Sequence, residues 1–127
     1  MALEAPGMNV GYLLANTDIS ASQYCAVFVT GADLKVDLQT SGAGPCLGIL
    51  QNKPIAGQAA DVRFSGVSKA KTGASYSRGV LLMSDGSGRL ILATATNTAI
   101  AYALEASGAA NELRTVLVMA GPSFKLP

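Results

Sequence analysis

Few residues of this chain are of types that could carry out chemistry. The sequence contains no histidine, which is the side chain most often used for proton transfer near neutral pH and the commonest metal ligand. Its two cysteines, Cys25 and Cys46, are twenty-one positions apart, which does not suggest a zinc site. Asp85 and Ser87 are close together but have no neighbouring base, and the acidic residues are scattered singly. We therefore expect no enzyme activity, metal, cofactor or small-molecule substrate.

A glycine-rich stretch at residues 42–48 is faintly similar to a phosphate-binding loop. A dinucleotide site needs a strand before such a loop and a helix after it. Here a β-type run follows, and the lysine and hydroxyl residues of a P-loop are absent. We interpret this stretch as a connecting loop.

Two sets of residues are candidates for contacts with other proteins. Four of the nine basic residues occur within sixteen positions, where they form either a solvated face or a contact with an acidic protein surface. Aromatic residues among them are too few for a single-stranded nucleic-acid site. The first 22 residues carry many apolar side chains, which we expect to pack on the domain or to cover a neighbouring molecule. The candidate contact residues are Leu3, Met8, Val10, Tyr12, Leu13, Leu14, Arg63, Lys69, Lys71 and Arg78.

Composition also favours contact between proteins. The 127 residues suffice for one domain, and only 13% of them are charged, about half the usual share. A surface this poor in charge is a candidate for burial against copies of the chain or against a partner. The net charge of +1 predicts no general attraction to nucleic acid, and every apolar run is far shorter than the ~18 residues of a membrane span. The N-terminus lacks the pattern of a secretory signal, so we expect a protein made inside the cell, with reduced thiols.

The elements that must position these residues are short β-type runs separated by turn signals. Asp85-Gly86 is a strong hairpin signal, and Gly66 within its run indicates a bulge or a sharp bend. Residues 99–110 have helical propensity but alternate like a strand, so the pattern alone leaves both possibilities open. The predicted strands are 23–30, 34–38, 46–50, 61–71, 80–83, 89–93 and 113–119.

Regular strands and turns of this kind predict an all-β fold, either a small β-barrel or a β-sandwich. Pro6, Gly7 and Gly11 would break a helix early, so residues 1–22 are predicted to be an extended N-terminal arm. Residues 23–120 then form a single β domain, and residues 121–127 form an irregular C-terminal tail. Deleting residues 1–16 is expected to weaken attachment to a partner while leaving the domain folded.

Several segments, taken in order, resemble the bacteriophage capsid cement proteins, also called head decoration proteins. Each segment is a short β run or a glycine turn, and the resemblance lies in their order and spacing over residues 19–119. The segments are Ile19–Cys25, Gly48–Leu50, Ala56–Val62 leading to Ser65–Val67, Gly79-Val80 before the Asp85-Gly86 turn, Tyr102–Ala106 and Leu113–Val118.

This resemblance implies a structural role on the exterior of a virion, after synthesis in the host cytoplasm. Such proteins bind the outside of an assembled capsid, often as trimers near local threefold axes, and hold neighbouring capsid subunits together. The implied partners are the major capsid protein and further copies of this chain, without nucleic acid or membrane. The resemblance also implies a strand at residues 99–106. The alternative is a non-catalytic β module that binds a ligand or glycan and is displayed on a virion or cell surface.

Overall fold

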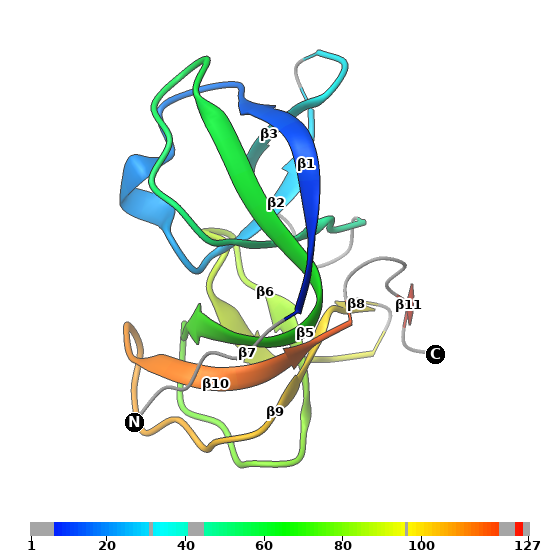
Figure 1. The fold of residues 1–127 in the computed structure, drawn as a ribbon. Coiled ribbons are helices and arrows are strands. Elements are labelled where there is room, and N and C mark those ends of the chain that lie inside the picture. The colour runs from blue at the N-terminus through cyan, green and yellow to red at the C-terminus, as the bar shows by residue number, and fades with distance from the viewer. Residues whose placement is uncertain (1–6, 31, 41–44, 96, 120–123, 126–127) are drawn as a thin grey trace.

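The computed structural model describes residues 7–30, 32–40, 45–95, 97–119 and 124–125, and this part of the chain consists mainly of short β-strands and turns (Figure 1). The predicted all-β class is confirmed. A single turn of 3-10 helix, η1 (Ser20–Ser22), interrupts the strands described. The strands are β1 (Gly7–Ala15), β2 (Ala26–Val29), β3 (Lys35–Leu38), β4 (Gly48–Leu50), β5 (Ala59–Lys71), β6 (Leu81–Ser84), β7 (Leu90–Leu92), β8 (Thr98–Ala99), β9 (Ala101–Ala103), β10 (Leu113–Val118) and β11 (Phe124–Lys125).

Five strands form a circuit of paired neighbours, which we call the ring. β1 pairs in parallel with β3 and antiparallel with β5, and the order β3–β2–β4–β5 completes the circuit. In Figure 1 the ring is the upper part of the molecule. Each of the five strands has a partner on both sides, so the ring leaves little unpaired strand edge.

β5 also begins the second region, which we call the curled sheet. From residue 66 onward β5 pairs with β10, and the sheet continues through β9 and β6 to β7. Gly66 has a φ of 108° and lies where β5 passes from one region to the other, in agreement with the bend predicted there. β7 returns to the end of β5 through a single bridge between Thr72 and Leu90.

β2 and β4 form a wall between two hydrophobic clusters. One cluster fills the ring and includes Val27, Leu50 and Val62. The other joins the opposite side of the wall to the curled sheet and includes Ile49 and Leu82. Successive residues of β4 therefore contribute to different clusters, as the alternation of a strand requires. Because both faces of the wall are buried, the ring and the curled sheet stabilise one another.

The predicted hairpin turn between β6 and β7 is present and connects the two regions. Asp85 donates its amide to the carbonyl of Arg89 at 2.7 Å, and its carboxylate accepts the amide of Ser87 at 2.8 Å. The carbonyl of Gly88 accepts the amide of Ala26 at 2.7 Å, which attaches the turn to the start of β2. Glycine suits this position because its φ is 75°.

Strands also occur in the segment that the sequence pattern left open and in the segment predicted to be irregular. Residues 99–110 include β9 and no helix, so alternation prevailed over helical propensity once β10 and β6 could pair with it. In the predicted irregular tail, Phe124–Lys125 pair with β8, while residues 121–123 and 126–127 lie outside the described part of the chain.

The N-terminal segment is extended and packs on the domain, which is one of the two alternatives expected for it. Residues 7–15 go further than an arm, because they form β1, a strand that closes the ring. Leu13 and Ala15 are buried in the ring cluster. Deleting residues 1–16 would remove this strand, so from the structure we expect that deletion to unfold the ring rather than leave the domain folded.

Candidate interaction surface

The apolar candidates of the first segment divide between the core and the surface. Leu13 is buried and Val10 packs against the ring cluster, so these two stabilise the domain and are unsuited to an external contact. Met8, Tyr12 and Leu14 are exposed. Leu3 lies outside the described residues.

Tyr12 is the most exposed large apolar residue that the structure describes, with 96% of its surface accessible. Its φ of 66° lies in the left-handed region, which an L-residue with a side chain adopts only at a cost. The cause is a bulge: Val10 pairs with Val62 and Leu13 with Ala60, so two residues of β1 oppose one residue of β5.

Two further exposed leucines accompany Tyr12 on the ring. Leu14 donates its amide to the carbonyl of Leu34 at 3.0 Å, which brings these two residues together at the junction of β1 and β3. Leu34 is 63% exposed and also has a left-handed φ, of 59°. We call Tyr12, Leu14 and Leu34 the Tyr12 patch.

The basic candidates do not form one patch. Arg63 is a structural residue, because its guanidinium donates to the side-chain oxygen of Asn9 at 3.0 Å and to the carbonyl of Val67 at 2.7 Å. These bonds link β1 to the bend of β5. Arg78 is exposed in the loop before β6, where its neighbour Gly79 donates its amide to Ala103 of β9.

Lys69 and Lys71 lie on the outward side of β5, close to Tyr24. The ammonium of Lys69 is 5.6 Å from the centre of the Tyr24 ring, within the range of a cation–π contact. Lys71 donates its amide to the carbonyl of Tyr24 at 2.9 Å.

A groove of about 390 Å³ opens beside Tyr24 and Lys71, between the ring and the curled sheet. Lys71 lines it together with Lys53, which follows β4 and is not among the contact residues predicted from the sequence. The residues lining the groove are Ser20, Ala21, Gln23, Tyr24, Lys53, Lys71, Asn111 and Leu113.

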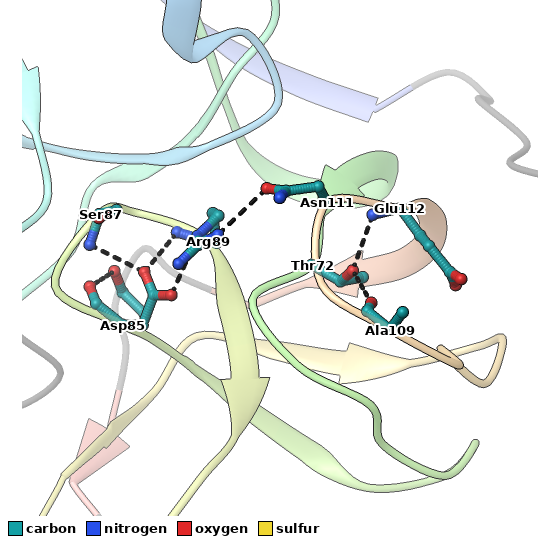
Figure 2. A network of polar contacts seen from close by, with 8 residues as sticks. Thr72, Asp85, Ser87, Arg89, Ala109, Asn111 and Glu112 are labelled. Carbon is teal, nitrogen blue, oxygen red and sulfur yellow. Dashed lines mark hydrogen bonds and ion pairs between the residues drawn. The ribbon is translucent and has the colours of Figure 1, made fainter.

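A polar network supports one wall of the groove (Figure 2). Arg89 bonds to Asp85 at 3.2 Å and donates to the side-chain oxygen of Asn111 at 3.1 Å. The hydroxyl of Thr72 donates to the carbonyl of Ala109 at 2.8 Å and accepts the amide of Glu112 at 3.0 Å. The loop that carries Asn111 is thus attached to the end of β5 and to the β6–β7 turn.

The curled sheet has a row of apolar side chains on the side away from the wall, which we call the outer row. Leu117 of β10 pairs with Tyr102 of β9 on one side and with Val67 of β5 on the other, and Tyr102 also pairs with Leu81 of β6. All four are partly exposed. The row therefore crosses four strands with apolar groups.

The groups that could be reactive are buried or dispersed. Burial raises the pKa of the Cys46 thiol to about 12 and raises that of Cys25 as well, so neither is an activated nucleophile. No three His, Cys, Asp or Glu side chains are grouped to hold a metal within the described ranges. In the same residues, no helix is long and apolar enough to cross a membrane.

Comparison with known proteins agrees with the resemblance seen in the sequence. The family model described as phage cement protein matches residues 7–120. A solved structure, the head fiber gp8.5 N base of bacteriophage phi29, has a TM-score of 0.70 at 16% identity and covers 94% of this chain and 99% of its own. At that identity the likeness shows a shared fold. No curated protein sequence matches the chain.

Proposed function

We propose that this protein binds the outer surface of an assembled capsid and strengthens it without catalysis. The proposal proceeds from the family: the chain belongs to the phage cement proteins and is a structural virion protein. Its partner in this role is the major capsid protein. The observation that carries the proposal is the Tyr12 patch, an aromatic and two leucines held out from the ring. Further support comes from the low charge of the chain, 13% of its residues.

The backbone of Tyr12 explains why this residue suits an interface. A left-handed conformation costs about 1–2 kcal/mol for a residue with a side chain, and burial within the domain does not compensate for it. Tyrosine is among the side chains that most often dominate binding energy when they enter a partner's pocket. We therefore assign Tyr12 to contact with the capsid. Many copies on one shell would make moderate contacts collectively strong.

We further propose that three copies meet at local threefold positions of the capsid, through the outer row of the curled sheet. This row is a continuous apolar face, because its side chains stand on adjacent strands of one sheet. A closed symmetric assembly would cover such a face. Light scattering on the isolated protein, with Leu117→Asp as the variant, tests this association. If the wild type and the variant both have the mass of a monomer at high concentration, a trimer in solution is refuted.

The capsid role is tested with mature shells that lack this protein. The wild type should attach saturably and raise the temperature at which the shells are disrupted. Tyr12→Gly should weaken attachment roughly thirtyfold, the effect of losing about 2 kcal/mol at an interface. Its folding should be unimpaired, because glycine accepts the left-handed φ of this position.

Leu92→Ala is the matched control, because Leu92 is a half-exposed apolar residue on β7, outside the Tyr12 patch. It should attach like the wild type. Failure of the wild type to attach to its own shell would disprove the capsid role. Equal attachment of the wild type and Tyr12→Gly would disprove the assignment of Tyr12 alone.

A further inference from the structure

The groove between the ring and the curled sheet is assembled from four separate parts of the chain. η1 and the turn after it supply Ser20 and Tyr24, the connection after β4 supplies Lys53, the end of β5 supplies Lys71, and the start of β10 supplies Leu113. Both regions must therefore be folded for the groove to exist.

The groove carries positive charge without an internal counter-charge. Its lining includes Lys53 and Lys71 but no aspartate or glutamate. Within the described residues, neither ammonium forms an ion pair. Lys69 adds a third cation at the Tyr24 ring. This arrangement favours an anionic occupant, since a carboxylate brought to these lysines gains charge-assisted hydrogen bonds.

The walls of the groove are held in place before any partner arrives. Tyr24 and Asn111 both have a left-handed φ, of 68° and 64°, although neither is glycine. Tyr24 donates its amide to Leu50 at 2.7 Å, and Asn111 donates its amide to Thr72 at 2.7 Å. Such strained positions persist where the surrounding bonds enforce them, and they concentrate at binding sites.

The side chain of Asn111 adds hydrogen-bond donors to the positive charge of the groove. Its oxygen accepts from Arg89 at 3.1 Å, as Figure 2 shows, so the amide NH₂ group is the part left for a partner. In the part of the chain that the structure describes, this NH₂ group has no acceptor. A carboxylate, which only accepts hydrogen bonds when ionised, complements such a set.

We infer that this groove binds the carboxylate side chains of an acidic segment of the capsid protein, a conclusion that rests on the proposed function. The volume of about 390 Å³ is at the lower end of ligand-sized pockets, which suits one or two acidic side chains. Leu113, 42% exposed, offers an apolar contact for the stem of such a side chain. The Tyr12 patch then supplies apolar anchoring, and the groove supplies charge recognition.

The first test uses an oligoglutamate peptide and does not depend on shells. Backbone amide NMR signals of Lys53, Lys71 and Asn111 should shift on titration at low salt, and the shifts should disappear in Lys53→Glu/Lys71→Glu. Ser75→Glu/Ser77→Glu is the control, because both serines are exposed and lie outside the groove, and its titration should resemble that of the wild type. Shifts that are absent or lie elsewhere would overturn the inference. So would an oligothymidylate that binds the same residues more tightly than the peptide.

The second test measures attachment to shells. Lys53→Glu and Lys71→Glu should each weaken attachment at least tenfold at low salt, and the loss should shrink as salt screens the charges. Ser75→Glu/Ser77→Glu, which makes the same change of two charge units, should weaken it less than twofold. If wild type and lysine variants attach equally, the groove inference fails while the capsid role stands. If the wild type does not attach at all, the capsid role fails, and the peptide titration still decides whether the groove binds acidic side chains.

Discussion

The ring and the curled sheet share β5 but close their strand order in different ways. The ring closes through a ladder of six residue pairs between β1 and β5. The curled sheet closes through a single bridge between Thr72 and Leu90, reinforced by the amide of Gly73 bonding to Leu90 at 2.8 Å. A complete strand, β1, therefore closes the ring, whereas no complete strand closes the curled sheet.

This difference explains where the two kinds of surface lie. Closure by bulged strands gives the ring few free edges and lets Tyr12 protrude from it. The curled sheet instead presents a regular row of side chains across its strands, including Tyr102 and Leu117. The groove lies between the two regions, and its shape depends on how they are held together.

Deleting residues 1–16 should have the largest effect on this architecture. The deletion removes all of β1 and the buried side chains of Leu13 and Ala15, so the ring loses its closing strand. We expect loss of the cooperative unfolding transition, followed by circular dichroism, and loss of dispersed amide signals from β3 and β5. Deleting residues 1–6 is the control, because it keeps every residue pair of β1. A cooperative transition in the longer deletion would show that the curled sheet and wall fold without closure of the ring.

The strands that the sequence predicted correctly are those with a clear signal of their own. Residues 34–38 alternate apolar and charged side chains, and the Asp85-Gly86 turn fixes the hairpin that follows. β1 gave no such signal because a bulge at Gly11 and Tyr12 interrupts the alternation along it. Pairing with residues about fifty positions away, as between Asn9 and Arg63, determines its conformation.

The candidate surface was predictable only in part for the same reason. Tyr12 and Leu14 were recognisable as apolar residues in an unusual place, but Leu13 between them belongs to the core. The basic residues were grouped by their distance in sequence, whereas Lys71 joins Lys53 in space. A groove built from segments between Ser20 and Leu113 has no local sequence pattern.

Truncating one leucine in each hydrophobic cluster tests whether the two regions unfold together. Leu50→Ala in the ring cluster and Leu82→Ala in the other cluster each remove a fully buried side chain and should cost about 2–5 kcal/mol of unfolding free energy. Because β5 and the wall belong to both regions, we expect one denaturant transition in both variants. Two separate transitions in Leu82→Ala would show that the ring is stable without the curled sheet.

Substituting Gly88 should loosen the attachment between the regions. An added Cβ would clash with Cδ1 of Leu38 and lie 3.0 Å from the carbonyl oxygen of Ala26 and 3.2 Å from the Cβ of Cys25, at a φ of 75°. We expect Gly88→Ala to lower the unfolding free energy by about 2 kcal/mol, from strain and crowding together. Gly86→Ala in the same turn is the control, because its Cβ would meet nothing closer than 3.9 Å and stability should change by less than about 0.5 kcal/mol. Equal effects of the two substitutions would mean that the turn does not hold the regions together.

Alkaline pH should lower the unfolding free energy through the cluster between the wall and the curled sheet, and this is the smallest of the expected effects. Cys46 belongs to that cluster, and burial raises its pKa from 9.0 to about 12. As pH rises above 9, the unfolded thiol loses its proton while the folded thiol keeps it, so stability is complete below pH 9 and declines toward pH 12. Between pH 8 and pH 10 we expect a loss of about 1.4 kcal/mol from this group, measured by denaturant unfolding.

Cys46→Ala should be less stable at pH 8 but should lose less unfolding free energy on going to pH 10. An unchanged difference between the two pH values in that variant would assign the alkaline weakening to other groups, among them Cys25, whose pKa is raised in the same direction.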